Sequence, residues 1–280
     1  MTQYTYALID GVMRQTAIKD LYQTQELVQV IPLYIGTRFQ DNYDLGPILV
    51  ASLEGSPLIH QLQQQWHVST TILQSEQYIS VIAEHLKQFI TVTDETGSTA
   101  LFRFADPLVT WYWLTSYQQN IPLDIFGPIT SWQVIKPIAD WQQPVTEWHT
   151  FKPMQDATLT HIRLDYLNEP QVKALDEAAD FRFKCKQYQL LIQKPNNPFL
   201  GASEQQITNW LDQTVANAEA NNLQTQRAIA IWLDLVADYG EDFLKQPGGA
   251  YQTWITHNHQ NKSLPLEINL EGFYRQLHNI

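Results

Sequence analysis

The sequence predicts an α+β fold, in which a mixed α/β N-terminal lobe with a small mixed sheet is followed by an all-helical C-terminal lobe. Short apolar segments of β character alternate with helical patterns in the first half, which is typical of a sheet flanked by helices. From residue 168 onward the pattern is helical throughout. A stretch rich in proline, tryptophan and polar residues, 136–153, joins the two parts. We therefore expect an α/β core domain at residues 1–150 and a helical lobe at 151–280.

The strands of the predicted sheet are segments rich in valine, isoleucine, tyrosine and threonine. They are expected at 4–9, 27–35, 48–53, 67–74 and 129–135. Helical segments are expected between them at 13–24, 57–65 and 76–89. A hairpin is also predicted, because two β-rich runs, Ile90–Thr93 and Thr99–Phe104, flank a polar turn that contains Gly97.

The second half contains several helix-start and helix-stop signals. Asn168, followed by Pro170 and Gln171, has the pattern of a capped helix start. Ser203 and Gln206 have the spacing of a capping box, in which each residue satisfies the backbone N–H of the other. Gly240 is a typical helix stop. The expected helices are 168–193, 203–220, 223–239 and 249–257.

Composition and charge indicate a cytoplasmic protein that binds neither nucleic acid nor membrane. The chain has 280 residues, of which 44% are hydrophobic and 16% charged, enough for a sizeable core. The chain has 17 basic and 29 acidic residues, so it carries a net negative charge. Nucleic acid is therefore an unfavourable partner, because phosphate binding requires a basic surface. The first ten residues lack the pattern of an export signal, and no apolar run is long enough to span a bilayer. Cys185 is the single cysteine, which excludes an intrachain disulfide.

The sequence carries little that predicts catalysis, so we expect no enzyme activity and no cofactor. It contains no glycine-rich nucleotide loop and no Gly-x-Ser-x-Gly nucleophile motif. The one close histidine pair is His257 and His259. Such a pair shares a face only in a strand, whereas this segment has the character of a helix end or polar loop. A metal-dependent hydrolase using His257, His259 and Asp10 remains an alternative.

Two positions in the first half are predicted to have structural roles. Asp10 precedes Gly11 at the end of the first strand, where an aspartate side chain commonly caps a turn. Arg103 and Asp106 lie three residues apart at a strand-to-helix junction, so we expect a salt bridge between them. Asp106 followed by Pro107 is also a typical helix start, with the aspartate as N-cap.

Aromatic residues are the least easily explained part of the composition, at 12% of the chain. A helix is expected from Asp106–Pro107 to about residue 119, and over its segment 108–114 it would be apolar nearly all round. Such a helix is either buried on every side or shared between the core and a partner, because large aromatics often dominate interfaces. The same alternatives hold for the apolar helix around residue 232. The candidate partner-contact residues are Trp111, Trp113, Tyr117, Trp132 and Trp232.

Four motifs, taken together, resemble a known family. They are the opening Tyr6–Gly11, the short strand Leu45–Val50, the Arg-x-x-Asp-Pro junction within Leu101–Pro107, and the Phe-Gly-Pro turn that contains Gly127 and Pro128. In this order they resemble the effector-adaptor chaperones of type VI secretion systems, a family first described as a domain of unknown function. The resemblance covers about residues 4–135.

The resemblance implies a cytoplasmic adaptor without enzyme activity. Such an adaptor would bind the N-terminal region of a cognate toxic effector and load it onto a spike protein of the VgrG or PAAR type. We expect the C-terminal helical lobe to grip the effector. Besides the metal-dependent hydrolase, the other alternative is a structural subunit of the secretion apparatus.

Overall fold

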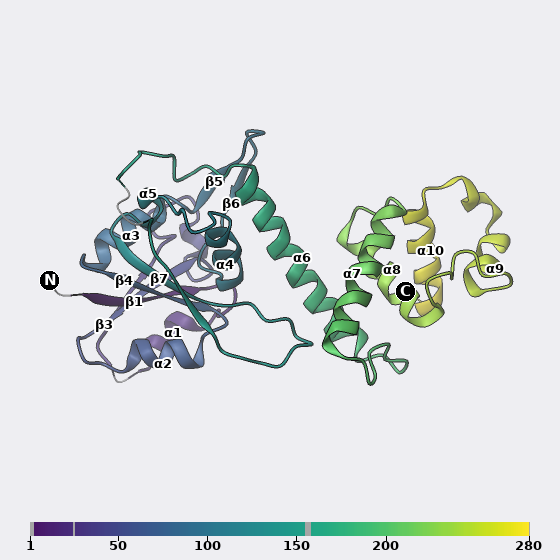
Figure 1. Cartoon of the computed structure of the whole chain (residues 1–280), viewed down its shortest axis with the longest axis horizontal. Coiled ribbons are helices and arrows are strands. Elements are labelled where there is room, and N and C mark those ends of the chain that lie inside the picture. The colour runs from purple at the N-terminus through teal and green to yellow at the C-terminus, as the bar shows by residue number, and fades with distance from the viewer. Residues whose placement is uncertain (1–2, 25, 155–157, 280) are drawn as a thin grey trace. The chain divides into compact units, whose positions relative to one another are not determined.

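The structure is a computed structural model that describes residues 3–24, 26–154 and 158–279. Two compact units make up the chain, and each is considered by itself (Figure 1). The boundary between them falls inside one continuous helix, α6 (Glu169–Leu191). The domain boundary expected at residue 150 remains a prediction. Unit 1 comprises Met1–Pro137 and Val145–Ala179, and unit 2 comprises Ile138–Pro144 and Asp180–Ile280.

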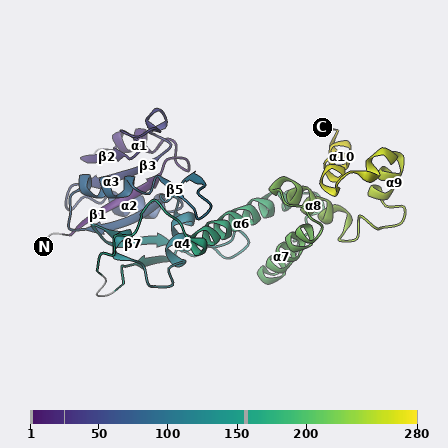
Figure 2. The same ribbon diagram turned by 90° about the horizontal axis from the view of Figure 1, so that it is seen from above.

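Unit 1 is built around a six-stranded sheet with the strand order β2-β3-β1-β4-β7-β8. All of its pairings are antiparallel, and the labels β2, β3, β1 and β7 follow one another in Figure 2. β1 and β4 are the two central strands, and β2 and β8 are the two edges. The strands are β1 (Tyr4–Asp10), β2 (Val28–Pro32), β3 (Pro47–Ser52), β4 (Thr70–Ser75), β7 (Ile129–Ile135) and β8 (Trp148–Phe151).

The two faces of the sheet bury separate hydrophobic cores, because neighbouring side chains of a strand point to opposite faces. In β1, Ala7 and Ile9 pack on one face, whereas Tyr6 and Leu8 pack on the other. Helices cover both faces, so unit 1 has three layers (Figure 1). The first face carries α1 (Ala17–Tyr22) and α2 (Leu58–Gln65), and the second carries α3 (Ile79–Lys87), α4 (Pro107–Thr115) and α5 (Leu123–Phe126).

The predicted hairpin is present beside this sheet as β5 (Thr91–Thr93) and β6 (Thr99–Leu101). Its turn is held by Asp94, whose Oδ1 accepts hydrogen bonds from the N–H groups of Thr96 (2.9 Å) and Ser98 (3.0 Å). The hairpin leads directly into the junction that starts α4. It therefore brings residues 102–106 to the end of the main sheet.

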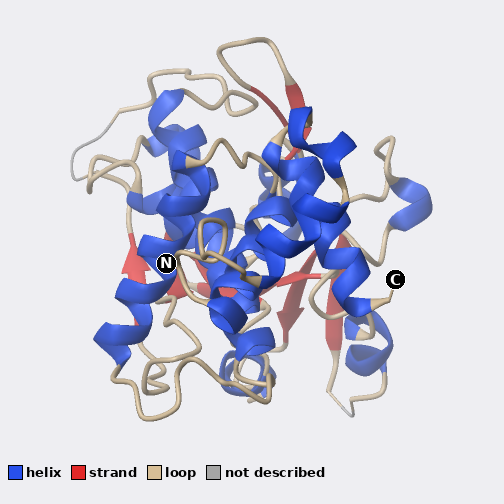
Figure 3. Cartoon of the chain, turned by 90° about the vertical axis from the view of Figure 1, so that its right-hand side faces the viewer, coloured by secondary structure: helices blue, strands red, loops and turns tan. Residues whose placement is uncertain are grey.

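Unit 2 is helical in its described residues (Figure 3). Its core surrounds α8, whose Leu233 and Leu235 are fully buried. The predicted capping box is confirmed, because Ser203 Oγ accepts from the N–H of Gln206 at the start of α7. Besides the second half of α6, its helices are α7 (Glu204–Ala220), α8 (Gln226–Tyr239), α9 (Ala250–His257), a short 3-10 turn (His259–Ser263) and α10 (Leu266–His278).

The predicted α+β class followed by a helical region is confirmed, with differences in detail. The sheet is antiparallel throughout, where a mixed sheet was expected. Strand β8 was missed because its two central residues are exposed and polar, which leaves no apolar run. The short α5 was also missed. Helix α10 was missed although Leu266, Leu270 and Phe273 have helical spacing, a signal that the sequence does contain.

The Phe-Gly-Pro turn depends on a close approach between the Gly127 backbone and the buried His85 ring. Gly127 has φ +52°, and a Cβ added there would lie 2.5 Å from Cε1 of His85. His85 is itself anchored, because its Nε2 donates to the carbonyl oxygen of Ile125 (3.0 Å). Neither the ring nor the backbone has room to move, so only glycine fits at this turn.

We expect Gly127→Ala to lower the free energy of unfolding by about 2–4 kcal/mol, because it adds overpacking to an unfavourable φ. Gly55→Ala is the matched control, since Gly55 also has a positive φ (+81°) but nothing within 4 Å of an added Cβ. The control should lose only about 1 kcal/mol. Urea unfolding of both variants measures the difference, and equal losses would show that the His85 contact contributes nothing.

Candidate functional site

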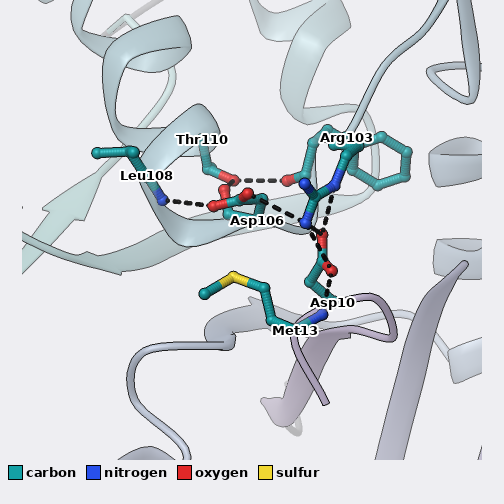
Figure 4. A network of polar contacts seen from close by, with 7 residues as sticks. Asp10, Met13, Arg103, Asp106, Leu108 and Thr110 are labelled. Carbon is teal, nitrogen blue, oxygen red and sulfur yellow. Dashed lines mark hydrogen bonds and ion pairs between the residues drawn. The ribbon is translucent and has the colours of Figure 1, made fainter. Parts of the chain in front are cut away.

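A buried ionic cluster lies where β1 ends and consists of Asp10, Arg103 and Asp106 (Figure 4). The Arg103 side chain donates from Nη2 to both oxygens of Asp10 (3.0 Å each) and from Nε to Oδ2 (3.3 Å). The same Nη2 lies 3.2 Å from Oδ2 of Asp106. Asp10 and Asp106 are buried, whereas the Arg103 side chain is 30% exposed. One guanidinium thus joins two carboxylates from distant parts of the sequence.

The α4 side of this cluster is set by local hydrogen bonds that the sequence anticipates. Asp106 is the N-cap, and its Oδ1 accepts from the N–H of Leu108 (3.1 Å). Pro107 occupies the first helical turn, where its missing N–H costs nothing. Thr110 donates from Oγ1 to the carbonyl oxygens of Phe104 and Asp106. The predicted cap and the predicted salt bridge between Arg103 and Asp106 are both confirmed.

The β1 side of the cluster depends on two glycines. Oδ1 of Asp10 accepts from the N–H of Met13 (3.0 Å), which confirms the predicted turn cap. Gly11 donates its N–H to the carbonyl oxygen of Gly46 (3.0 Å), so the two chain segments touch. A Cβ on Gly46 would lie 2.5 Å from the Tyr34 ring, and one on Gly11 would overlap the Asp44 carbonyl oxygen. Close backbone packing therefore explains the glycines of the first two motifs.

Burial and charge act in opposite directions on this cluster. Burial raises the pKa of the Asp10 carboxyl above its usual range, and the Arg103 guanidinium opposes that shift. Burial lowers the pKa of Arg103, but the Asp10 and Asp106 carboxylates outweigh it and hold the pKa above its ordinary value. Burial, followed by the nearby Asp10 charge, raises the pKa of Tyr34. The cluster is therefore an ion pair under strong desolvation, and its cation is essential to it.

Three of the predicted partner-contact tryptophans lie in the cores of their units. Trp113 is 1% exposed, Trp132 is 0% exposed and Trp232 is 4% exposed. Trp113 packs edge-on against Phe102 and Trp132 in unit 1. As a correction, the expected contact role does not hold for these three side chains in this structure, because each unit uses them to fill its own interior.

Trp111 and Tyr117 are half-buried, so their predicted contact role stays open. Trp111 stacks edge-on against His149 (5.5 Å) and Phe151 (5.7 Å) of β8. Burial raises the pKa of Tyr117 to about 12. Of the two, Trp111 borders a surface hollow.

The hollow beside Trp111 lies between α4 and the first turns of α6, within unit 1. It has a volume of about 560 Å³. Its apolar part comes from aromatic rings and an alanine, and its rim carries both signs of charge. The lining residues are Trp111, Tyr112, Thr115, Ser116, Gln118, Glu169, Pro170, Lys173, Ala174 and Glu177. A hollow with an aromatic wall and a charged rim suits the side chains of an amphipathic protein segment.

Unit 2 has a hollow of about 590 Å³ over a second ionic cluster. Lys194 Nζ lies 2.6 Å from Asp234 and 2.8 Å from Asp238, both on α8. Burial lowers the pKa of Lys194, but hydrogen bonds to the two carboxylates outweigh it and raise the pKa. Tyr274 and His278 of α10 also line this hollow. The lysine holds the end of α6 against α8, so the cluster is structural.

The residues considered for metal or redox chemistry do not converge in the described structure. Nδ1 of His257 donates a hydrogen bond to the carbonyl oxygen of Thr253, and both His257 and His259 are exposed. Among the described residues, no group of His, Cys, Asp and Glu is arranged to hold a metal ion. Asp10 belongs to unit 1 and is held by Arg103, whereas the two histidines belong to unit 2. Burial raises the pKa of the Cys185 thiol, which favours its unreactive protonated form.

The pairing of Asp10 with Arg103 was not predicted. The two residues are 93 positions apart, and no local spacing rule connects them. The only available signal was indirect: each stands beside a motif that needs a fixed backbone conformation.

No helix among the described residues is long and apolar enough to cross a membrane.

The comparisons with known proteins identify one domain. A family model described as "Domain of unknown function (DUF4123)" matches residues 5–120. The match includes the whole ionic cluster and three of the four motifs, and it ends before the Phe-Gly-Pro turn. No curated protein and no solved structure matches the chain.

We expect Arg103→Met to lower the free energy of unfolding by about 2–3 kcal/mol, because it leaves two buried carboxylates without their cation. Replacing both partners, Arg103→Met with Asp10→Asn, should cost less than the sum of the two single changes. Chemical unfolding of the three variants measures this coupling. Strictly additive losses would show that the pair does not act as a unit.

The Arg103→Met variant should also become more sensitive to pH. Burial already holds the native pKa of Asp10 above its unfolded value, and removing the cation would raise it further. An acid with a raised native pKa binds protons more readily in the folded state, so its stabilising contribution is lost as pH rises through that pKa. The variant should therefore lose more stability than the wild type as pH rises above the ordinary aspartate pKa of about 4. Adding Asp10→Asn should remove most of that difference.

Proposed function

We propose that this chain is a cytoplasmic, non-catalytic adaptor that binds a toxic effector and loads it onto the VgrG or PAAR spike of a type VI secretion system. The observation that carries the proposal is the ionic cluster within the matched domain. Its Arg-x-x-Asp-Pro junction is the most diagnostic part of the resemblance to effector adaptors, and it lies inside residues 5–120. The function of that domain is not part of its description, so the adaptor role is our inference.

The arrangement of unit 1 supports this proposal through its division into rigid and exposed parts. The ionic cluster fixes the start of α4 against the end of β1. One face of α4 buries Trp113 and Leu114 in the core, whereas Trp111 and Thr115 line the hollow. A rigid helix that presents an aromatic wall reduces the ordering cost of binding. We place an effector contact at this hollow.

We also propose that unit 2, the helical lobe, contacts the effector. Its Trp232 is not available for contact, so any grip must use surface residues such as those that line the hollow over Lys194. Its large core keeps the helices in place without a partner.

The proposal predicts that the full chain co-purifies with the toxin encoded by the neighbouring gene and with a spike protein. Thr115→Arg should reduce recovery of the toxin on the order of tenfold, because a long charged side chain would fill the hollow. Thr115 is exposed, so the fold should be unaffected. Quantitative co-purification from cells that express all three proteins measures the effect.

The matched control is Gln65→Arg, which adds the same side chain at an exposed position of α2 on the other face of the sheet. It should leave toxin recovery unchanged. Recovery of baseplate or sheath proteins in place of a toxin would favour a structural subunit. Turnover of a substrate by the purified chain would contradict a non-catalytic adaptor.

A further inference from the structure

We infer that the edge strand β2 is a docking site for an extended, apolar segment of a partner protein that carries a basic residue at its end. Such a segment would add to the sheet as a further strand beside β2. This inference rests on the fold of unit 1 alone and does not depend on the proposed function. The argument has three parts: unpaired backbone groups, exposed leucines and the charge next to them.

The backbone groups of β2 that point away from the sheet have no partner in the described chain. The N–H of Leu33 donates to the carbonyl oxygen of Pro47 on β3 (2.8 Å). Because residues of an antiparallel strand alternate in direction, the N–H and C=O groups of Val28 and Val30 point to the open side. Within the described residues, no other strand pairs with β2 and no hydrogen bond reaches these groups. They form a template for one more strand.

The side chains at the start of β2 are unusually apolar for an exposed edge. Leu27 is 72% exposed and Leu53, which follows β3, is 58% exposed. The register pairs Val28 with Ser52, so extending it by one residue brings Leu27 opposite Leu53. Natural edge strands are usually protected by lysine, by inward-pointing charge or by a covering segment. β2 itself contains no charged residue, and its one protective feature is Pro32 at the far end.

The opposite edge, β8, is better protected. It has four residues, one fewer than β2, and Lys152 and Pro153 follow it directly. Lysine and proline both discourage the addition of a further strand. The side chains of His149 and Phe151 on β8 also pack against the Trp111 ring. Strand addition is therefore favoured at β2.

The charges beside the exposed leucines identify the kind of partner. Glu26 precedes Leu27, and Glu54 follows Leu53. Two carboxylates therefore flank the exposed leucines at this end of the edge, and no basic residue stands beside them in the sequence. A lysine or arginine at the end of an added strand would complement this negative charge. A second copy of the chain would instead add two more carboxylates, so a basic-ended partner segment is favoured.

The test uses the full chain and a synthetic peptide of alternating threonine and valine with lysine at both ends. Binding should slow amide hydrogen exchange at Val30 on the order of tenfold, as measured by NMR. Val28→Pro should abolish this protection, because it removes an N–H that points to the open side while leaving the bonds to β3 intact. Val28→Ala is the matched control, since it also shortens the side chain but keeps the N–H.

Each outcome decides the inference. Protection in the wild type and in Val28→Ala, with none in Val28→Pro, supports strand addition at β2. The same peptide with glutamate at both ends should protect Val30 less, and equal protection would overturn the basic-ended partner. No protection by the lysine peptide would overturn the docking site itself. A dimer in sedimentation that Val28→Pro abolishes would assign this edge to a second copy and overturn the inference.

Discussion

The position of α4 in unit 1 depends on one guanidinium held between two buried carboxylates. Arg103 joins the end of β1, through Asp10, to the first turn of α4, through Asp106. These elements are distant in sequence, and the intervening chain contributes three more strands to the sheet (β2, β3 and β4) and three helices to its faces (α1, α2 and α3). Once the cluster forms, the direction of α4 is fixed. That direction decides which tryptophans enter the core and which remain at the surface.

The burial of the cluster makes the pairing of its charges a requirement of the fold. Burying two carboxylates is costly, and the one guanidinium between them offsets part of that cost. The arrangement therefore penalises any alternative packing that separates Arg103 from its partners. The glycine contacts act in the same way, because Gly11, Gly46 and Gly127 each allow an approach that a side chain would block. The ionic cluster and the glycine contacts therefore each require one specific arrangement of the chain segments, which a purely apolar junction would not.

The sequence predicts the features that short-range rules govern. The N-cap at Asp106, its bridge to Arg103 and the capping box at Ser203 follow from spacing alone, and all are present. Features that require the folded chain are different. The bond from Arg103 to Asp10 spans 93 residues, and no local pattern indicates it.

The aromatic residues show the same limit of sequence reasoning. A helix that is apolar nearly all round is compatible with full burial and with a binding surface. The structure divides α4 between the two: Trp113 is in the core, and Trp111 lies at the hollow. Periodicity cannot make that division, because it depends on contacts between distant segments: Trp113 packs against Trp132 of β7, whereas Trp111 packs against the edge strand β8. β8 itself was missed for lack of an apolar run.

Much of the aromatic content of unit 1 therefore serves its own core. The proposed contacts with partners use other features of its described residues, namely the hollow between α4 and α6 and the open edge at β2. The hollow adjoins β7 and β8, at the opposite side of the sheet from β2. Strands are spaced by about 4.8 Å, so the two edges of a six-stranded sheet lie roughly 24 Å apart.

That separation matters for the proposed adaptor role, in which the chain would hold two proteins at once. Two segments that dock at opposite edges of one rigid sheet do not compete for the same atoms. The ionic cluster lies at the end of β1, between these edges, and holds the start of α4 against the sheet. Breaking it should weaken binding at the hollow, because α4 forms one wall. It should leave strand addition at β2 intact, because β2 is held by its own ladder to β3.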